Sequence, residues 1–241
     1  NMNLQIQNWN AFKEINRRRR AIKDFEDFYI PDQDVLDILE EAILAPSSAN
    51  SQPYQIHWIK TPELKSQVAK ACNGQRAAAQ ANGLLVFVTS TDILKNTIKR
   101  YAAHIQQSKV LTEKSKAFHG NNFRLLGNFL KIAPLVIWTP ILGFFSWFLP
   151  ALSILPFGAM GIKHWTAKNS IFAAQNLLLA TVAKGYDACP MEGFNAQKIA
   201  SLLDLPYGSV IPIVIAFGKR RSDANVEPQW RRSIDDVVKI Y

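Results

Sequence analysis

Gly83-Leu-Leu-Val-Phe-Val-Thr89 is a continuous apolar run, and it decides the class of fold. Apolar residues without alternation are typical of a strand that other elements cover on both faces. Ser209-Val-Ile-Pro-Ile-Val-Ile-Ala-Phe217 is a second run of this kind, in which Pro212 indicates an edge strand or a bulge. Tyr54-Gln-Ile-His-Trp-Ile59 alternates in polarity and predicts a further strand. The sequence therefore predicts a central sheet with helices packed on it.

Helical patterns occupy the intervals between these strands. Trp9, Phe12 and Ile15 recur every three residues and predict a helix over 8–18 with one apolar stripe. The clearest helix spans 31–45, because a proline suits its first position and apolar residues recur on one face. The predicted buried face consists of Val35, Leu36, Ile38, Leu39, Ala42 and Ile43.

Residues 168–184 are apolar almost all round, so we expect a core helix that buries Ile171 and Phe172 and ends before Gly185. Strands interleaved with long helices indicate an α/β or α+β sandwich. Further helices are expected over 62–70, over 195–203 and in parts of 91–128.

The chain has 241 residues, 48% of them hydrophobic, and no linker or repeat divides it, so we expect a single domain over 1–241. A net charge of +9 favours anionic partners without choosing among them. Cys72 and Cys189 lie far apart, which argues against a disulfide framework. Because no secretory signal is evident either, we expect a cytoplasmic protein.

Sequence patterns exclude several types of catalytic centre. His57, His104, His119 and His164 show no HxxxH or HxH spacing, so no metal site is expected. A GxSxG nucleophile motif is absent, and so are the phosphate-binding patterns GxGxxG and GxxxxGK[ST]. Any phosphate group would therefore be bound without a Gly-rich loop.

Three polar stretches remain. Arg17-Arg-Arg-Arg-Ala-Ile-Lys-Asp-Phe25 could hold nucleic acid, a membrane surface or one small phosphate, or could be a solvated face. Ala45-Pro-Ser-Ser-Ala-Asn-Ser-Gln-Pro-Tyr54 would form an ordinary loop or a preformed polar pocket. Pro190-Met-Glu-Gly-Phe194 would by itself be a turn, and Phe217-Gly-Lys-Arg-Arg221 follows it much later. No single stretch decides the function.

In this order and at these separations, the motifs resemble the FMN-dependent nitroreductase family. That family has an Arg-x-Ser-x-Lys-x-Phe pattern and a Pro-Ser-x-x-Asn-x-Gln-Pro-Trp loop, and the resemblance covers residues 10–90 and 163–233. This sequence departs from the patterns at Ala21, which replaces serine, and at Tyr54, which replaces tryptophan. The matching segments are 19–25, 46–54, 165–168, 187–194 and 218–221.

The resemblance implies an α+β fold (an α/β sandwich) with a central mixed, mainly antiparallel sheet flanked by helices. It also implies an obligate homodimer that binds FMN, takes hydride from NADH or NADPH and reduces a nitroaromatic or quinone-like acceptor by a ping-pong mechanism. The alternatives are another flavoenzyme of this superfamily, such as a flavin reductase, an enone reductase or a dehalogenase. In a different class, the alternative is a non-enzymatic binder of nucleic acid or polyphosphate.

The resemblance further implies the roles of individual residues. Four cations from both ends of the chain would bind the FMN phosphate, because arginine forks bind phosphate oxygens in pairs. Lys23 would face the pyrimidine edge of the ring and stabilise the reduced flavin. The backbone N–H of Glu192 or Gly193 would point at flavin N5, and no side chain would act as a nucleophile or general base. The four phosphate-binding cations are Arg19, Arg20, Lys219 and Arg221.

The remaining implied cofactor contacts come from two groups of residues. In this family the Pro-Ser loop reaches the flavin of the partner subunit. Its residues here are Pro46, Ser47, Ser48 and Asn50. The contacts from the same subunit are Ala21, Asn73, Pro190 and Met191.

No charged side chain occurs between Lys131 and Lys163. We interpret this part as a variable apolar insertion at about 130–162 that packs as a cap near the dimer interface and the flavin, as most apolar stretches are core. The alternative is a membrane-surface patch within 132–162, and its recurrent prolines make a straight membrane-spanning helix the least favoured interpretation.

Overall fold

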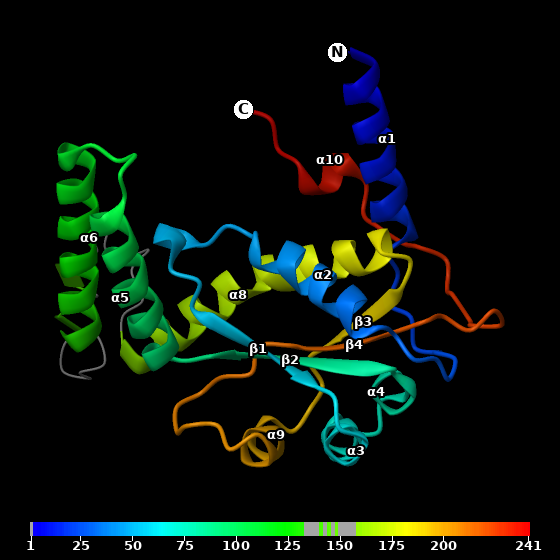
Figure 1. The fold of residues 1–241 in the computed structure, drawn as a ribbon. Helices are drawn as coiled ribbons and strands as arrows, with labels where there is room; N and C mark the ends of the chain where they lie inside the picture. The colour runs from blue at the N-terminus through cyan, green and yellow to red at the C-terminus, as the bar shows by residue number, and fades with distance from the viewer. Residues whose placement is uncertain (1, 133–139, 142–143, 146–147, 149–157) are drawn as a thin grey trace.

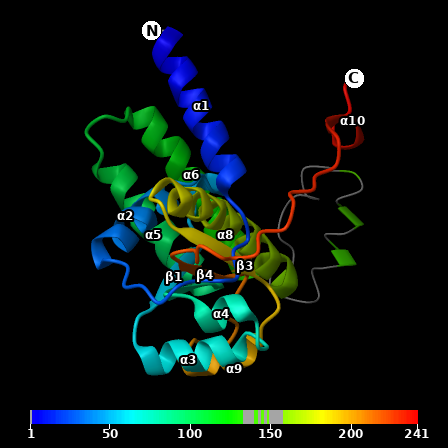
Figure 2. The same ribbon diagram turned by 90° about the vertical axis from the view of Figure 1, so that its right-hand side faces the viewer.

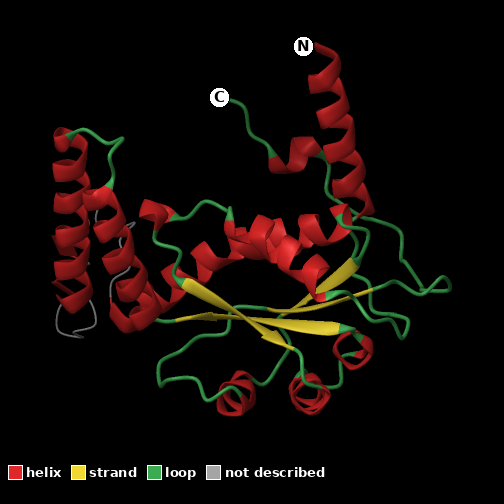
Figure 3. Ribbon diagram, viewed as in Figure 1, coloured by secondary structure: helices red, strands yellow, loops and turns green. Residues whose placement is uncertain are grey.

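The computed structural model describes residues 2–132, 140–141, 144–145, 148 and 158–241. Its centre is a four-stranded sheet in the order β1-β2-β4-β3, with helices on both faces (Figures 1 and 3). This architecture confirms the expected α+β sandwich. The strands are β1 (Tyr54–Ile59), β2 (Gly83–Thr89), β3 (Asp187–Met191) and β4 (Val214–Gly218). The helices are α1 (Met2–Arg18), α2 (Asp32–Ile43), the 3-10 turn η1 (Ser48–Asn50), α3 (Pro62–Ala71), α4 (Arg76–Gln80), α5 (Thr91–Gln107), α6 (Glu113–Ile132), α8 (Gly158–Ala183), α9 (Ala196–Leu202) and α10 (Ile234–Val237).

β2 is the strand around which the sheet is built. All of its residues are buried, and it pairs antiparallel with β1 on one side and with β4 on the other. The segments 54–59 and 83–89 thus form the predicted strands. Of the two alternatives predicted at Pro212, the bulge is confirmed: Val86 pairs with Val214 and Thr89 with Val210, so three residues that include Pro212 lie opposite two residues of β2. The edge is wrong, because β4 lies between β2 and β3. Since proline has no N–H to donate, the regular pairing of this segment begins only beyond it.

β3 was not expected as a strand. It pairs antiparallel with β4 and, among the named strands, with no other, so it forms an edge of the described sheet. An edge position accommodates Pro190, which lacks the N–H that an inner strand would need. Beyond that edge, Ala188 makes an isolated parallel bridge with Ala21. This bridge gives the sheet its mixed character.

α2 and α8 cover one face of the sheet, and α3, α4 and α9 cover the other (Figures 1 and 2). α8 begins ten residues before the predicted start, and it is not buried all round, because Ile171 and Phe172 are exposed. Leu36 and Ile43 of α2 are exposed as well. The two helices pack on the sheet and on each other, so each leaves an apolar side uncovered within one chain.

Both ends of the chain project from the same side of the sandwich (Figures 1 and 2). The predicted first helix is longer than expected. None of its side chains is buried by the part of the chain that the structure describes, and the predicted apolar stripe with Trp9 and Phe12 is open to solvent. The C-terminal segment carries exposed Trp230, Ile234 and Ile240.

α5 and α6 form a helical arm at one end of the sheet (Figure 1). A third apolar cluster joins the arm, through Leu94, Ile98 and Phe123, to Ile162 of α8. Residues 91–128 are therefore more helical than predicted. Within the described residues, no helix combines the length and the apolar character needed to cross a bilayer. Most of the 130–162 insertion, and with it the choice between cap and membrane patch, lies outside the described residues.

We predict that G83A lowers the free energy of unfolding by about 1–3 kcal/mol, as overpacked substitutions do. An added Cβ at Gly83 would lie 2.3 Å from Cζ of Phe217, whose side chain is buried in the core. G127A is the matched control, because nothing lies within 4 Å of an added Cβ in α6. It should be neutral or stabilise by up to about 1 kcal/mol. Urea unfolding at one protein concentration compares the two, and equal midpoints would contradict the packing argument.

Candidate functional site

Segment 19–26 runs beside β3 and the end of β4. The Ile22 N–H donates to the Ala188 carbonyl at 3.2 Å, and the Arg221 N–H donates to the Asp24 carbonyl at 3.1 Å. These hydrogen bonds join the start of the chain to its last strand. The basic residues near the N-terminus and those after β4 therefore lie side by side, as the sequence motifs predicted.

Two apolar side chains anchor this segment. Ile22 and Phe25 are buried in the same cluster as Cys189 of β3. Full burial of a side chain of this size stabilises by about 1.5–3 kcal/mol. Lys23 lies between the anchors and is exposed. Its ammonium group is therefore carried outward, next to the β3 edge.

The three cationic side chains after β4 point in alternating directions, because the chain is extended there. Arg220 turns inward and forms two hydrogen bonds to the buried carboxylate of Asp187, at 3.1 and 2.6 Å. Lys219 and Arg221 are exposed. Arg220 therefore holds the strand end in place, while the other two cations remain at the surface.

Arg19 lies in a strongly cationic environment. Burial lowers the pKa of its guanidinium, and the neighbouring Arg231 and Arg20 lower this pKa further. Arg20 also donates to the backbone carbonyl of Glu227. Among the described residues, no carboxylate lies within ion-pair distance of these three arginines. Such a cluster suits an anion, which would relieve the mutual repulsion of the cations.

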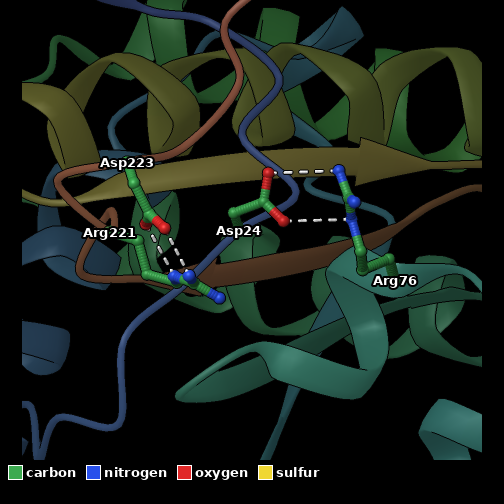
Figure 4. A network of polar contacts seen from close by, with 4 residues as sticks. All are labelled: Asp24, Arg76, Arg221 and Asp223. Carbon is green, nitrogen blue, oxygen red and sulfur yellow. Dashed lines mark hydrogen bonds and ion pairs between the residues drawn. The ribbon is translucent and has the colours of Figure 1, made fainter.

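Two arginine–aspartate ion pairs lie near segment 19–26 and the end of β4 (Figure 4). Asp24 is buried and holds Arg76 of α4 through both carboxylate oxygens, at 3.0 and 3.1 Å. Arg221 forms a similar pair with the exposed Asp223, at 2.8 and 2.5 Å. The first pair fixes α4 against segment 19–26. The second neutralises Arg221 in the free protein, so an anion bound there would have to compete with Asp223.

Lys219 is also engaged within the chain. Its ammonium lies 2.5 Å from a carboxylate oxygen of Glu26 and 4.6 Å from the ring centre of Phe28. Both partners are at the surface, and exposed ion pairs of this type contribute about 0–1 kcal/mol. The contact therefore does not bar Lys219 from binding another anion.

The predicted turn after β3 lies next to Asn73. Met191 is buried at the strand end, and Glu192 and Gly193 follow it at the surface. The Gly193 carbonyl accepts from Nδ2 of Asn73 at 3.2 Å and from Nε2 of Gln75 at 2.7 Å. No hydrogen bond among the described residues uses the N–H of Glu192 or of Gly193. These two N–H groups are thus available to a ligand, while the hydrogen bonds from Asn73 and Gln75 hold the Gly193 carbonyl in place.

The loop with Ser47, Ser48 and Asn50 is held in a defined shape. The Ser48 N–H donates to Oδ1 of the buried Asn169 at 2.8 Å, and the Gln52 N–H donates to Oγ of Ser47 at 3.0 Å. Asn50 has φ of 51°, in the left-handed region that few residues other than glycine adopt. Several fixed side chains over-determine this conformation, a pattern that occurs at ligand sites.

Within one chain, this loop does not join the basic cluster. It follows α2 and lies at the end of the sheet away from segment 19–26 (Figure 1). The structure thus brings together the same-subunit part of the predicted site and leaves out the part assigned to the partner subunit. The residues left out are Pro46, Ser47, Ser48 and Asn50.

Metal binding has no support in the described part of the chain, where no group of three or more His, Cys, Asp or Glu side chains is suitably placed.

The profile of the nitroreductase family matches residues 17–219, which include all four strands, segment 19–26, the Pro-Ser loop and the turn at Gly193, but not Arg220 and the residues after it. The chain belongs to the nitroreductase family. Protein DrgA of Synechocystis is 29% identical over 218 residues, which cover 90% of this chain and 86% of that protein. The putative NAD(P)H nitroreductase YfkO of Bacillus subtilis is 26% identical and covers 92% of this chain and 93% of its own.

Solved nitroreductase structures have the same fold. A putative NAD(P)H:FMN oxidoreductase from Staphylococcus epidermidis is 25% identical, with a TM-score of 0.73 and 95% of each chain covered. A putative nitroreductase from Exiguobacterium sibiricum, solved in complex with FMN, is 22% identical and also has a TM-score of 0.73. It covers 95% of this chain and 97% of its own.

Several residues that shape the site were missed by the sequence motifs. Gln75 shares the Gly193 carbonyl with Asn73, and Asn169 holds the Pro-Ser loop. Arg231 adds to the charge around Arg19. Asn169 directly follows the matched segment 165–168, which was the one available signal. The other contacts join parts of the chain that only the fold brings together.

We predict that D24N lowers the free energy of unfolding by about 1–3 kcal/mol. The substitution removes the negative charge of the buried Asp24 carboxylate, with which Arg76 forms two contacts. D223N is the matched control, since it breaks a similar arginine pair at the surface and should cost less than about 1 kcal/mol. The main-chain bond from Arg221 to the Asp24 carbonyl is kept in both variants. Equal losses in urea unfolding would show that burial of Asp24 is not what makes its pair important.

We also predict that both thiols resist alkylation in the native protein. Burial raises the pKa of Cys72 to about 11, and it raises the pKa of Cys189 although Lys23 and Arg19 act in the opposite direction. The thiolate is the reactive form, so reaction with iodoacetamide at pH 8 should be slow and should accelerate as the pH rises towards 11. Denatured protein is the control and should react at both cysteines. Rapid labelling of the native protein at pH 8 would contradict this prediction.

Proposed function

We propose that this nitroreductase family member is an FMN-dependent oxidoreductase that transfers hydride from NADH or NADPH to a nitroaromatic or quinone-like acceptor. The observation that carries the proposal is the convergence of cations from both ends of the chain beside two unused backbone donors. The names of the relatives support it, since several are NAD(P)H nitroreductases and one structural neighbour was solved with FMN.

The FMN phosphate fits the cationic cluster. It carries nearly two negative charges, and Arg19 and Arg20 have no carboxylate partner among the described residues. Arg221 would exchange its exposed pair with Asp223 for the phosphate, and Lys219 would leave Glu26 in the same way. A charge-assisted hydrogen bond of this type contributes about 1.5–3 kcal/mol. Ala21 supplies no hydroxyl, so these cations would carry the affinity.

The ring of the flavin would lie along the edge of β3. Bound FMN supplies the atom that accepts and donates hydride. Lys23 would place its positive charge at the pyrimidine edge, and Asn73 would contact the same polar edge. The N–H groups of Glu192 and Gly193 would donate towards N5, in a geometry fixed by the hydrogen bonds to the Gly193 carbonyl. Glu192 would act through its main chain, so its carboxylate would be dispensable.

The complete site would need two copies of the chain. The Pro-Ser loop is preformed but lies far from the cations of its own chain (Figure 1). The exposed apolar sides of α1 and α8 would become buried between protomers, since Trp9 is 58% and Phe172 is 51% exposed in one chain. Exposed apolar surface of this kind marks an interface. A homodimer would then hold two flavins, each contacted by Ser47, Ser48 and Asn50 of the opposite copy.

The first test is the colour of the purified protein. We expect a yellow protein that bleaches when NADH or NADPH is added without oxygen and recovers its colour with a quinone. R19A should weaken FMN binding about tenfold or more in a fluorescence titration, since it removes a charge-assisted contact. R17A removes the same charge from an exposed neighbouring position and should change the affinity less than twofold. A colourless protein that binds DNA in a salt-dependent way would reject the proposal in favour of a nucleic-acid binder.

The second test separates main-chain from side-chain roles. E192Q should keep turnover within about threefold of the unchanged protein, because its backbone N–H is retained. K23A should lose turnover by about tenfold or more, since the cation near the ring is removed. Both rates are measured with saturating FMN. Equal loss in the two variants would show that the Glu192 carboxylate takes part.

A further inference from the structure

A cavity of about 590 Å³ lies between the end of α2, the start of β1 and the arm helix α5. A volume of this size suits a small aromatic molecule. One wall is apolar and includes Leu39, Ile43 and Ile56. The cavity is separate from the cationic cluster around Arg19, with which it shares no lining residue.

The opposite wall carries a guanidinium and an imidazole. Arg100 and His104 are four residues apart on α5, so they lie on the same face of the helix and both line the cavity. The ring of Tyr101 also lines it and is stacked on His104, with ring centres 6.5 Å apart. Among the described residues, no aspartate or glutamate lines the cavity. Its polar chemistry therefore favours a ligand that carries negative charge.

Arg100 differs from the three described arginines that form ion pairs. Arg76, Arg220 and Arg221 each hold a carboxylate. Arg100 makes no ion pair with any described residue, although it stands at the mouth of a partly apolar hollow. A guanidinium in this position is available for a bidentate contact with a carboxylate of a ligand.

The cavity is continuous with the Pro-Ser loop. Gln52 and Tyr54, at the end of that loop, form part of its wall. Thr97 of α5 also lines it and donates to the Gln52 carbonyl at 3.4 Å. The arm and the loop are thus joined at the cavity. If the loop reaches the flavin of the partner subunit, the cavity opens beside that flavin.

We propose that this cavity binds the electron acceptor, and that Arg100, assisted by His104, selects aromatic acceptors that carry a carboxylate or phenolate. The apolar wall takes the ring, the Arg100 guanidinium pairs with the anionic group, and the His104 imidazole adds a hydrogen bond. This inference rests on the proposed function, because it places the acceptor next to the flavin. It concerns the arm helix, for which neither the motifs nor the family match assigns a role.

Binding is tested first, without turnover. Benzoate is titrated calorimetrically into the FMN-loaded protein, and benzyl alcohol serves as the neutral partner. In R100Q, benzoate affinity should fall about tenfold or more, because one charge-assisted pair is lost. K99Q is the matched control: it removes the same charge from the adjacent exposed residue, which does not line the cavity. It should change benzoate affinity less than twofold, and benzyl alcohol should bind all three proteins alike.

Two outcomes of this titration would overturn the inference. Equal losses in R100Q and K99Q would mean that only the general positive potential attracts the anion. Absence of benzoate binding to the unchanged protein would mean that another occupant, such as a side chain of the second copy, fills the cavity.

Turnover then separates this inference from the proposed function. With 4-nitrobenzoate, R100Q should raise KM about tenfold, whereas KM for 4-nitrobenzyl alcohol and the rate of bleaching by NADH should stay within twofold. If NADH bleaches the flavin but R100Q changes KM equally for the two acceptors, the role of Arg100 is overturned and the proposed function stands. A protein that binds no flavin overturns both.

Discussion

The attachment of segment 19–26 to the edge of β3 is the interaction on which the site depends. Main-chain hydrogen bonds join this segment to β3 and to the residues after β4, and the buried side chains of Ile22 and Phe25 pack in the core beneath it. Without this attachment, the arginines near the N-terminus and those after β4 would belong to separate surfaces. With it, they form one cationic region along the sheet edge. Under the proposed function, this short stretch of chain would perform the task that a Gly-rich loop performs in other phosphate-binding folds.

Charges at this edge are divided according to direction. Those that point inward are neutralised: Arg220 by Asp187, and the buried Asp24 by Arg76. Those that point outward are unpaired or held only by exposed carboxylates, as Arg221 is by Asp223. Inward pairs avoid the cost of an isolated buried charge, and outward cations keep their attraction for an anion. The same extended backbone thus carries stabilising ion pairs on one side and surface cations on the other.

Local patterns predicted much of this molecule. The apolar run at 83–89, the alternation at 54–59 and the helical pattern at 195–203 are short-range signals, and each of these elements was confirmed. β3 was missed, because it gains its pairing from distant strands and contains Pro190. Exposure of Phe172 was also not predictable, since its surroundings depend on how α8 lies across the sheet.

The candidate site shows the same limit. The motifs placed the cations and the turn at Gly193, but partners such as Gln75, Asn169 and Arg231 come from segments whose proximity only the fold creates. The contacts assigned to the second protomer stay predictions. The spacing of the motifs therefore predicts which residues of the chain bind a ligand. The residues that orient those side chains are brought close to them only by the tertiary fold.

The arm formed by α5 and α6 has an apolar cluster distinct from the two clusters that sandwich the sheet. Its exposed residues, such as Lys99 and Arg100, belong to none of these clusters, so their exchange leaves the apolar packing unchanged. Surface substitutions of this kind usually change the free energy of unfolding by less than about 0.5 kcal/mol. Natural variation could alter chemical preference there while the rest of the polypeptide stays constant, which makes the appendage a favourable starting point for directed evolution.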